Sequence, residues 1–441
     1  MKTTGKSIFK TTALILTVIT FSSLASFGAQ VQKTFSWKYP ANSQTHIGLD
    51  NYNCDLVIHA WEKSETEFHL TVEATGKTPD DEARLVKFLE NLKFPNSGSE
   101  ISFRTSFWKE RNTINGTTTI KTDGEKDMKF TEFNMKGELW LPAGNSFGLD
   151  SKYSRIDMSD FNGKLTLALY NDNFYGAGLT EPLEMTAKYA NVEFKDLKGI
   201  RAELYNCTFE AGNIGVTELD SKYSKFNAKS SENVTVDSYN DKFTFSSTGD
   251  LKFSGKYSDI TSPVSGKVTL DIYNGTITLN SSKSISLSSK YAEFRFDKTG
   301  DIRIGDSYND KFDIGSVTSV TVDVSKYSNY KIDDLGQSLA EADGYNDNFM
   351  VAKTSSALKE ITMTGKYNEL TVGVPVSLNL RLKANIKYPT FEINEASFTT
   401  RTKISDDSGL QYDGVKGTEK DGMPVIDVKG YNMTLKIQDL K

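Results

Sequence analysis

Residues 188–206 read KYANVEFKDLKGIRAELYN and residues 239–257 read YNDKFTFSSTGDLKFSGKY, and these two stretches decide the fold. Each contains two short runs in which apolar and polar residues alternate with period two, a pattern typical of half-buried strands. A turn rich in Gly, Ser, Asn or Asp separates the two runs. The apolar positions of the first stretch are Val192, Phe194, Ile200, Ala202 and Leu204.

The two stretches belong to a repeat that is marked by tyrosine. Most successive tyrosines of this repeat are 16 to 19 residues apart, and two forms alternate, Lys-Tyr and Tyr-Asn. The unit is therefore about 17 residues long, or about 34 when the two forms are counted as a pair. The tyrosines stand at 153, 170, 189, 205, 223, 239, 257, 273, 291, 308, 327, 345, 367 and 388.

Strands this short cannot bury their apolar faces alone, whereas stacked copies bury a continuous core. The repeat therefore predicts an all-β fold, a parallel β-solenoid (single-stranded β-helix) with two-strand coils of about 17 residues. A 34-residue coil of four strands is the alternative. It would make Asp172, Asp241 and Asp310 direct neighbours, where like charges repel, so the shorter coil is favoured.

The ends of the chain differ from its middle. We expect a signal peptide over 1–29, an N-terminal capping region over 30–145, a repetitive solenoid over 146–391 and a C-terminal cap over 392–441. Apolar residues at helical spacing in TPDDEARLVKFLENLKF predict one short helix inserted in the N-terminal cap. Both caps would protect the open edges of the solenoid from pairing with other chains.

The first 29 residues carry three lysines, then an apolar run and then small residues, as secretory signal peptides do. Cleavage after Ala25 or after Gly28 fits equally well. Neither Cys54 nor Cys207 lies near the cleavage region, and no other stretch reaches the roughly 18 apolar residues of a membrane span. We therefore expect an exported chain without a lipid anchor or transmembrane span, located in the periplasm, on the outer cell surface or outside the cell.

Composition excludes two classes. An apolar fraction of 37% among 441 residues is enough for a buried core, which excludes a disordered chain. A net charge of −6 without a basic run beyond the N-terminus offers no footprint for nucleic acid.

The Tyr-Asn corners supply the candidate site. Their rings could stack on sugars or only stabilise the solenoid, since tyrosine joins an apolar face to a polar tip. The corner aspartates Asp172, Asp241, Asp310 and Asp347 could bind calcium, but Asp also favours tight turns, and that interpretation is preferred. The possible ligand-facing or structural ladder comprises Tyr170, Tyr205, Tyr239, Tyr273, Tyr308, Tyr345, Asn171, Asn240, Asn309 and Asn346.

Chemistry beyond the corners is not indicated. His46, His59 and His69 lack a Cys, Asp or Glu cluster that would complete a metal site, and no nucleophile motif accompanies them. Cys54 and Cys207 are both corner residues, and no disulfide between them is expected. We thus predict no catalytic residue, no metal and no cofactor.

The order of features resembles the putative adhesin family of bacterial envelope proteins, a β-solenoid domain of unknown function. The resemblance rests on a first coil with Ile58, Trp61 and Glu62, a helical insertion, the strand ending in Leu141-Pro142, many coils and a final strand pair. The Tyr/Asn-rich texture is similar to that of proteins from gut-type Bacteroidetes, whereas Ser, Gly and Asp are usual in such coils.

The resemblance implies an exported, non-catalytic, adhesin-like binding protein that engages a surface glycan or an envelope or host protein. The alternatives are a structural or sensory periplasmic scaffold without a ligand and, third, a polysaccharide-acting β-helix enzyme. Short, uniform turns leave little material for a catalytic cleft, so an enzyme is not expected.

Overall fold

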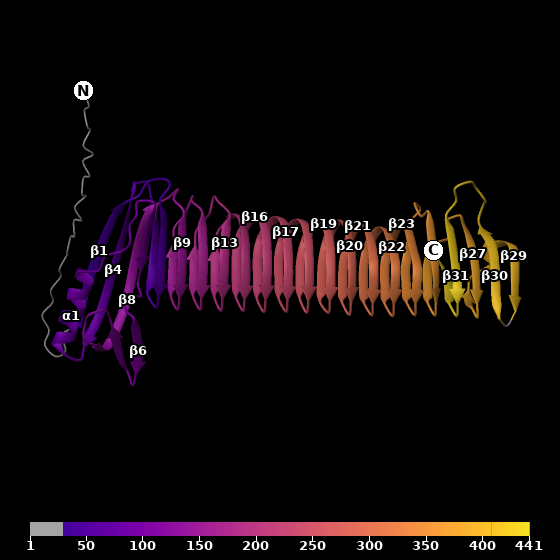
Figure 1. The fold of residues 1–441 in the computed structure, drawn as a ribbon. Coiled ribbons are helices and arrows are strands. Elements are labelled where there is room, and N and C mark those ends of the chain that lie inside the picture. Colours follow the sequence, from indigo (N-terminus) through magenta and orange to yellow (C-terminus); the bar gives the residue numbers. More distant parts are fainter. Residues whose placement is uncertain (1–29, 407, 441) are drawn as a thin grey trace, which may run out of the picture. The chain divides into compact units, whose positions relative to one another are not determined.

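The computed structural model describes residues 30–406 and 408–440, and it confirms a parallel β-solenoid with one short helix near the N-terminus (Figure 1). The predicted signal peptide lies outside the described residues. The chain forms two compact units, 1–197 and 198–441.

The first unit begins with antiparallel strands. The strand β1 (Gln30–Pro40) pairs with β4 (Glu65–Gly76), and β4 pairs with β8 (Met128–Pro142). The hairpin of β6 (Glu110–Ile114) and β7 (Thr117–Lys121) extends β8.

The predicted helix is α1 (Pro79–Glu90). It follows a capping box in which Thr78 and Asp81 hydrogen-bond each other's backbone, and it buries Leu85 and Leu89.

Parallel coils follow in the first unit. Each coil has one strand in each of two rows. The first row is β5 (Glu100–Arg104), β2 (His46–Tyr52), β9 (Phe147–Lys152), β11 (Leu165–Tyr170) and β13 (Leu183–Lys188). The second row is β8, β3 (Asp55–Trp61), β10 (Arg155–Met158), β12 (Asn173–Gly176) and β14 (Asn191–Phe194). The coil made by β2 and β3 therefore stacks directly on the coil made by β9 and β10.

Coils of the second unit are longer and more regular, and Figure 1 shows them side by side. Lys225 pairs with Lys242, which fixes a 17-residue coil and rules out the 34-residue alternative. Each coil is one long strand that bends in its middle, where separate short strands were expected, because hydrogen bonds to the next coil continue through the bend. The strands are β15 (Leu197–Tyr205), β16 (Thr208–Lys222), β17 (Lys225–Tyr239), β18 (Lys242–Lys256), β19 (Asp259–Tyr273), β20 (Thr276–Lys290), β21 (Glu293–Tyr308), β22 (Lys311–Lys326) and β23 (Asn329–Tyr345).

The core of the second unit contains the alternating apolar residues that the pattern predicts. Phe226, Phe243, Leu251 and Phe253 are all at most 2% exposed. Phenyl rings of successive coils stack, as Phe209 does on Phe226 at a centroid distance of 4.7 Å. Burial of each such ring contributes roughly 1.5–3 kcal/mol.

The last coils do not follow chain order. After β24 (Asn348–Thr354), the strands are β25 (Glu360–Lys366), β26 (Glu369–Pro375), β27 (Leu380–Lys387), β28 (Thr390–Glu392), β29 (Phe398–Asp406), β30 (Gly409–Lys416), β31 (Val425–Tyr431) and β32 (Thr434–Leu440). The final pair, β31 and β32, lies between the coil of β25 and β26 and the coil of β27 and β28.

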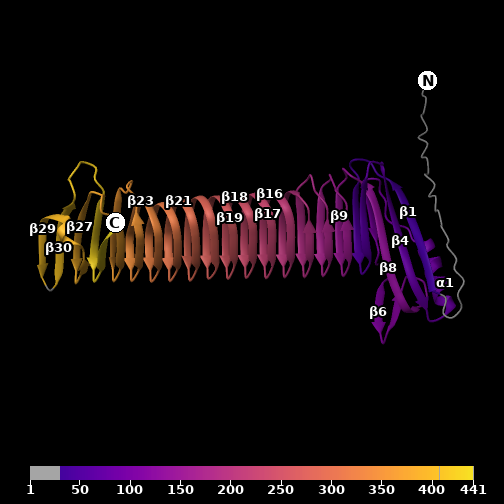
Figure 2. The ribbon, with the colours of Figure 1, turned by 180° about the vertical axis from the view of Figure 1, so that it is seen from behind.

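Two antiparallel strands then close this end of the second unit (Figure 2): β30 pairs with β27, and β29 pairs with β30. The exposed outer strand β29 carries Arg401 and Lys403, charges that discourage edge-to-edge pairing.

Candidate binding surface

Every coil of the second unit turns at a corner whose central residue has a left-handed backbone. In the described part of this unit φ at these residues lies between 51° and 63°. The amide of each such residue still donates across to the next coil, as Tyr257 N–H does to the carbonyl of Tyr273. The left-handed residues are Asn206, Tyr223, Asn240, Tyr257, Asn274, Tyr291, Asn309, Tyr327, Asn346, Tyr367, Tyr388 and Asn432.

The position before each left-handed residue completes a surface that we call the tyrosine edge. At this position tyrosine and lysine alternate from coil to coil, opposite to the alternation of Asn and Tyr at the left-handed position. The preceding residues are Tyr205, Lys222, Tyr239, Lys256, Tyr273, Lys290, Tyr308, Lys326, Tyr345, Lys366, Lys387 and Tyr431. Each corner thus presents one tyrosine, and only Tyr, Lys and Asn occupy the edge.

This alternation explains the tyrosine spacing. Left-handed residues from Asn206 to Tyr291 are 17 apart, whereas their tyrosines are alternately 18 and 16 apart because the ring shifts by one position in every coil. The shift also turns successive rings, so that Tyr257 meets Tyr273 at an interplanar angle of 79° and a centroid distance of 5.6 Å. Edge-to-face pairs of this geometry are favourable.

The rings form one uninterrupted row in the second unit. Successive centroids lie 5.4 to 5.7 Å apart from Tyr205 to Tyr367, and the row then continues to Tyr431 and ends at Tyr388. Exposure runs from 37% at Tyr239 to 51% at Tyr388. The row is neither buried in the corners nor fully exposed.

Left-handed backbone is unfavourable for a tyrosine, since its Cβ approaches the following carbonyl. Asn tolerates it better, and Asn fills the same position in every second coil. The retention of tyrosine therefore points to a use for the ring itself, either in packing against neighbours or in contacting a ligand.

Buried carboxylates hold the corners from inside. Asp310 Oδ1 accepts from the Ala292 amide (2.8 Å), and its Oδ2 accepts from Ser289, Ser307 and the Tyr308 amide. Burial raises the pKa of Asp310, while these hydrogen bonds oppose the rise. Asp241 and Asp347 have the same role.

The first unit repeats this corner on its own, with a row of Tyr52, Tyr153, Tyr170 and Tyr189 at centroid distances of 5.5 to 5.6 Å. There Asp172 accepts from the amides of Ser154 and Tyr170, and burial raises its pKa to about 6.

The candidate ladder residues of the sequence stage thus divide by position. The six tyrosines all lie in the rows described above, with Tyr170 in the first unit. Asn171, Asn240, Asn309 and Asn346 are left-handed corner residues. The spacing pattern missed the second tyrosine of each pair of coils as a surface residue, and it missed the lysine row altogether.

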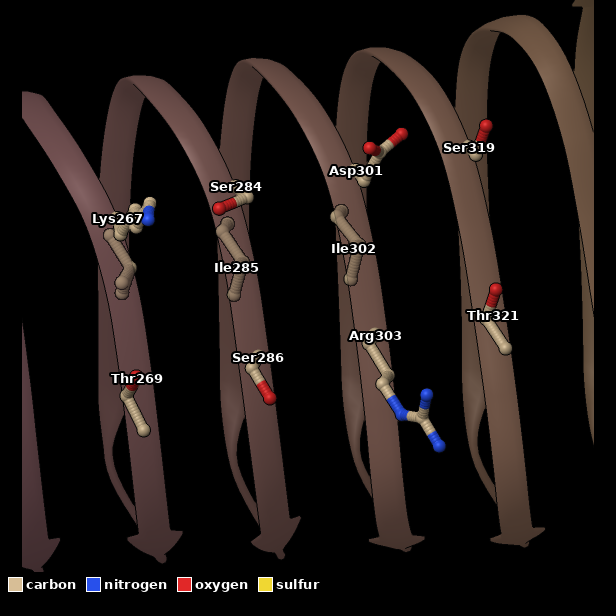
Figure 3. Close-up of a pocket in the computed structure, with 11 residues that line it drawn as sticks. Lys267, Thr269, Ser284, Ile285, Ser286, Asp301, Ile302, Arg303, Ser319 and Thr321 are labelled. Atoms are coloured by element: carbon tan, nitrogen blue, oxygen red, sulfur yellow. The ribbon is translucent and has the colours of Figure 1, made fainter.

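A shallow hollow lies on one face of the second unit, across β19 to β22 (Figure 3). Its volume is about 570 Å³. Short Ser284 and Ser286 leave the space, and the longer Lys267 and Arg303 stand on the strands at either side. Arg303 also pairs with Asp323 at 2.9 Å. The hollow could take a small polar molecule.

The histidines have ordinary structural contacts. His46 lies 2.9 Å from the Ser146 hydroxyl, His59 stacks on Trp140, and His69 pairs with Glu67. Within residues 30–406 and 408–440 no group of three His, Cys, Asp or Glu is placed to hold a metal ion. Cys54 and Cys207 are both buried, free thiols. No helix in the described ranges has the length and apolar character needed to cross a membrane.

Comparison with known proteins gives one structural likeness. No family model matches the chain, and no curated protein matches it. A solved structure, described as that of a putative cell adhesion protein from Clostridium sporogenes, aligns over 92% of this chain and 100% of its own, at 9% identity and a TM-score of 0.17. At that level of similarity it carries no argument about function.

Proposed function

We propose that this chain is an exported, non-catalytic, adhesin-like binding protein of the bacterial cell envelope, which engages a glycan or a protein partner through the tyrosine edge. The observation that carries the proposal is the row of half-exposed rings along the second unit, from Tyr205 to Tyr388.

Three features of the edge suit binding. Tyrosine offers large contact area at a low cost in side-chain entropy, and its hydroxyl supplies a hydrogen bond. The backbone beneath each ring is fixed by the inter-coil hydrogen bonds and by the buried aspartates, so the surface is preorganised. Repetition lets one partner make many similar contacts, which raises avidity.

A scaffold without a ligand is the second candidate, and ring packing favours it. Each interior ring makes edge-to-face contact with two neighbours, as Tyr257 does with Tyr239 and Tyr273. Such contacts alone would stabilise the stack of coils.

An enzyme is the third candidate and is not favoured. The corners are short turns, and the carboxylates nearest the edge, such as Asp310, are engaged in holding backbone amides. General acid and base catalysis would need such groups to face a substrate.

Substitution of left-handed tyrosines separates the first two candidates. The variant Tyr257→Asn, Tyr291→Asn, Tyr327→Asn replaces three rings by the residue that neighbouring coils already use at this position. Wild type and variant would be applied to arrays of glycans and of envelope and host proteins. A binder is expected to lose its signal in the variant, whereas unchanged signals, or none with either protein, would favour a scaffold.

A matched control replaces exposed apolar side chains away from the edge. Val216 and Val264 are 44% and 51% exposed, and neither lies at a corner. The variant Val216→Asn, Val264→Asn should bind as wild type does. Export would be tested separately by protease treatment of intact cells, with a periplasmic protein as the lysis control; protection until the outer membrane is broken would contradict a surface adhesin.

A further inference from the structure

We infer that the tyrosine edge takes a linear anionic polysaccharide with one acidic group for every two sugars. This inference rests on the proposed function and names its ligand class. It comes from the charges of the edge, which the argument for binding does not use.

The lysines of the edge form a row with a two-coil period. In the register of the coils, Lys256 pairs with Tyr273, and Tyr273 pairs with Lys290, so a lysine stands at every second coil. With a coil spacing of about 4.8 Å, the cations repeat about every 10 Å. An extended β-linked disaccharide advances by a similar length.

These lysines are available to a ligand. Lys222, Lys256, Lys290, Lys326, Lys366 and Lys387 are all exposed. In the described part of the chain none of them is in an ion pair, and no acidic residue occupies either column of the edge. The acids at the corners, such as Asp241 and Asp310, point inward and are buried.

Between two lysines, the edge presents rings and amides. Tyr257 and Tyr273 lie side by side between the levels of Lys256 and Lys290, with Asn274 at the next corner. The apolar face of a pyranose can pack on such rings, and its hydroxyls can bond to the tyrosine hydroxyls and the amide. One disaccharide would therefore meet one cation and two rings.

Flanking acids set an upper limit on the charge density of the partner. Two residues before the edge, Asp237, Asp271, Asp306 and Asp343 are exposed on the strands. They would repel a polymer that carries a charge on every unit, and nucleic acid most of all, with a charge about every 1.7 Å. A sparse polyanion avoids this repulsion while it still meets the lysines.

Hyaluronan fragments test the inference, because they alternate a glucuronate with a neutral N-acetylglucosamine. The mature chain would be titrated with fragments long enough to cover the coils of Lys256, Lys290 and Lys326. Neutral chitin oligomers, polygalacturonate with an acid on every sugar, and polyglutamate without sugar rings serve as comparison ligands. Hyaluronan should bind most tightly, and added salt should weaken it.

A lysine variant gives the decisive contrast. Lys256→Gln, Lys290→Gln, Lys326→Gln should weaken hyaluronan binding about tenfold or more, from three exposed charge contacts. The control Lys229→Gln, Lys252→Gln, Lys283→Gln removes the same net charge from exposed lysines off the edge and should bind as wild type does.

The outcomes separate this inference from the proposed function. Equal weakening by both lysine variants, or tighter binding of polygalacturonate or polyglutamate, would overturn the specific register between lysines and sugar acids. Binding of a neutral glycan or a protein on the arrays, with no binding of hyaluronan, would overturn the inference and leave the proposed function standing. No binding to any ligand would overturn both.

Discussion

The ring of Tyr257 meets the ring of Tyr273 nearly at a right angle, although the two residues hold different positions in their corners. Tyr257 has the left-handed backbone itself, whereas Tyr273 precedes the left-handed Asn274. The two kinds of tyrosine should therefore respond differently to substitution.

For Tyr257→Asn, two opposing effects nearly cancel. The change loses two edge-to-face contacts, each about 0.5–1.5 kcal/mol, and relieves left-handed strain of about 1–2 kcal/mol. We expect the free energy of unfolding to change by no more than about 1 kcal/mol. Tyr273→Ala loses two contacts without relief and should cost about 1–3 kcal/mol. Denaturant unfolding of the mature chain measures both, and equal losses would show that backbone strain is unimportant.

Replacement of Asp310 by Asn should open its corner. The amide nitrogen would face the N–H and O–H donors that one carboxylate oxygen now accepts. Leaving a buried donor without an acceptor costs about 1–3 kcal/mol, and we expect a loss of this size in the free energy of unfolding. The exposed neighbour Asp306 is the control, and Asp306→Asn should change stability by less than about 0.5 kcal/mol. Similar effects of both changes would contradict a structural role for the corner aspartates.

Buried Glu341 makes stability depend on pH in the alkaline direction. Its Oε2 accepts from Asn368 (2.7 Å), whereas Oε1 has no hydrogen-bond partner among the described residues. Burial, and then the charge of Asp347, raise its pKa to about 9 from the model value of 4.5. The folded state thus holds the proton more tightly, so this group's contribution to stability is complete below pH 4.5 and declines as pH rises towards 9.

Glu341→Gln removes this decline. The variant should match wild type near pH 5 and exceed it by about 2–4 kcal/mol near pH 8, because one pKa unit corresponds to about 1.4 kcal/mol. Unfolding free energies of both proteins across that pH range provide the test. Parallel pH profiles would show that Glu341 ionises normally in the folded protein.

Periodicity in the sequence predicted most of the solenoid because each coil repeats the same local conflict between short apolar runs and polar turns. Inward residues such as Phe243 and Leu251 follow directly from it. The preference for the 17-residue coil also came from a local argument, the repulsion between like charges, and the register between Lys225 and Lys242 confirms that coil.

Stacking order could not be predicted, because spacing along the chain does not show which coils touch. Tyr52 packs against Tyr153 across the inserted N-terminal strands, and Tyr431 lies between Tyr367 and Tyr388. The signal for both was the Tyr-Asn pair at 52–53 and 431–432, which recurs outside the regular repeat.

The binding surface was only half visible in the sequence. The tyrosine column was predicted, but the exposure of its rings depends on where each corner stands relative to its neighbours. The alternation of 16 and 18 residues does encode the shift of the ring about a constant coil. The hollow beside Ser284 and Ser286 needed the register itself, since it arises from size differences between residues on adjacent coils.

Chemical footprinting of the tyrosines tests the central claim most directly. The mature chain would be nitrated with and without the array ligand that it binds most tightly, and modification would be located by mass spectrometry. The account predicts that the ligand slows nitration of Tyr257, Tyr291 and Tyr327 several-fold and leaves Tyr175, which lies outside the edge, unchanged. Unaltered nitration of the edge tyrosines while the ligand is bound would contradict the claim that the tyrosine edge is the binding surface.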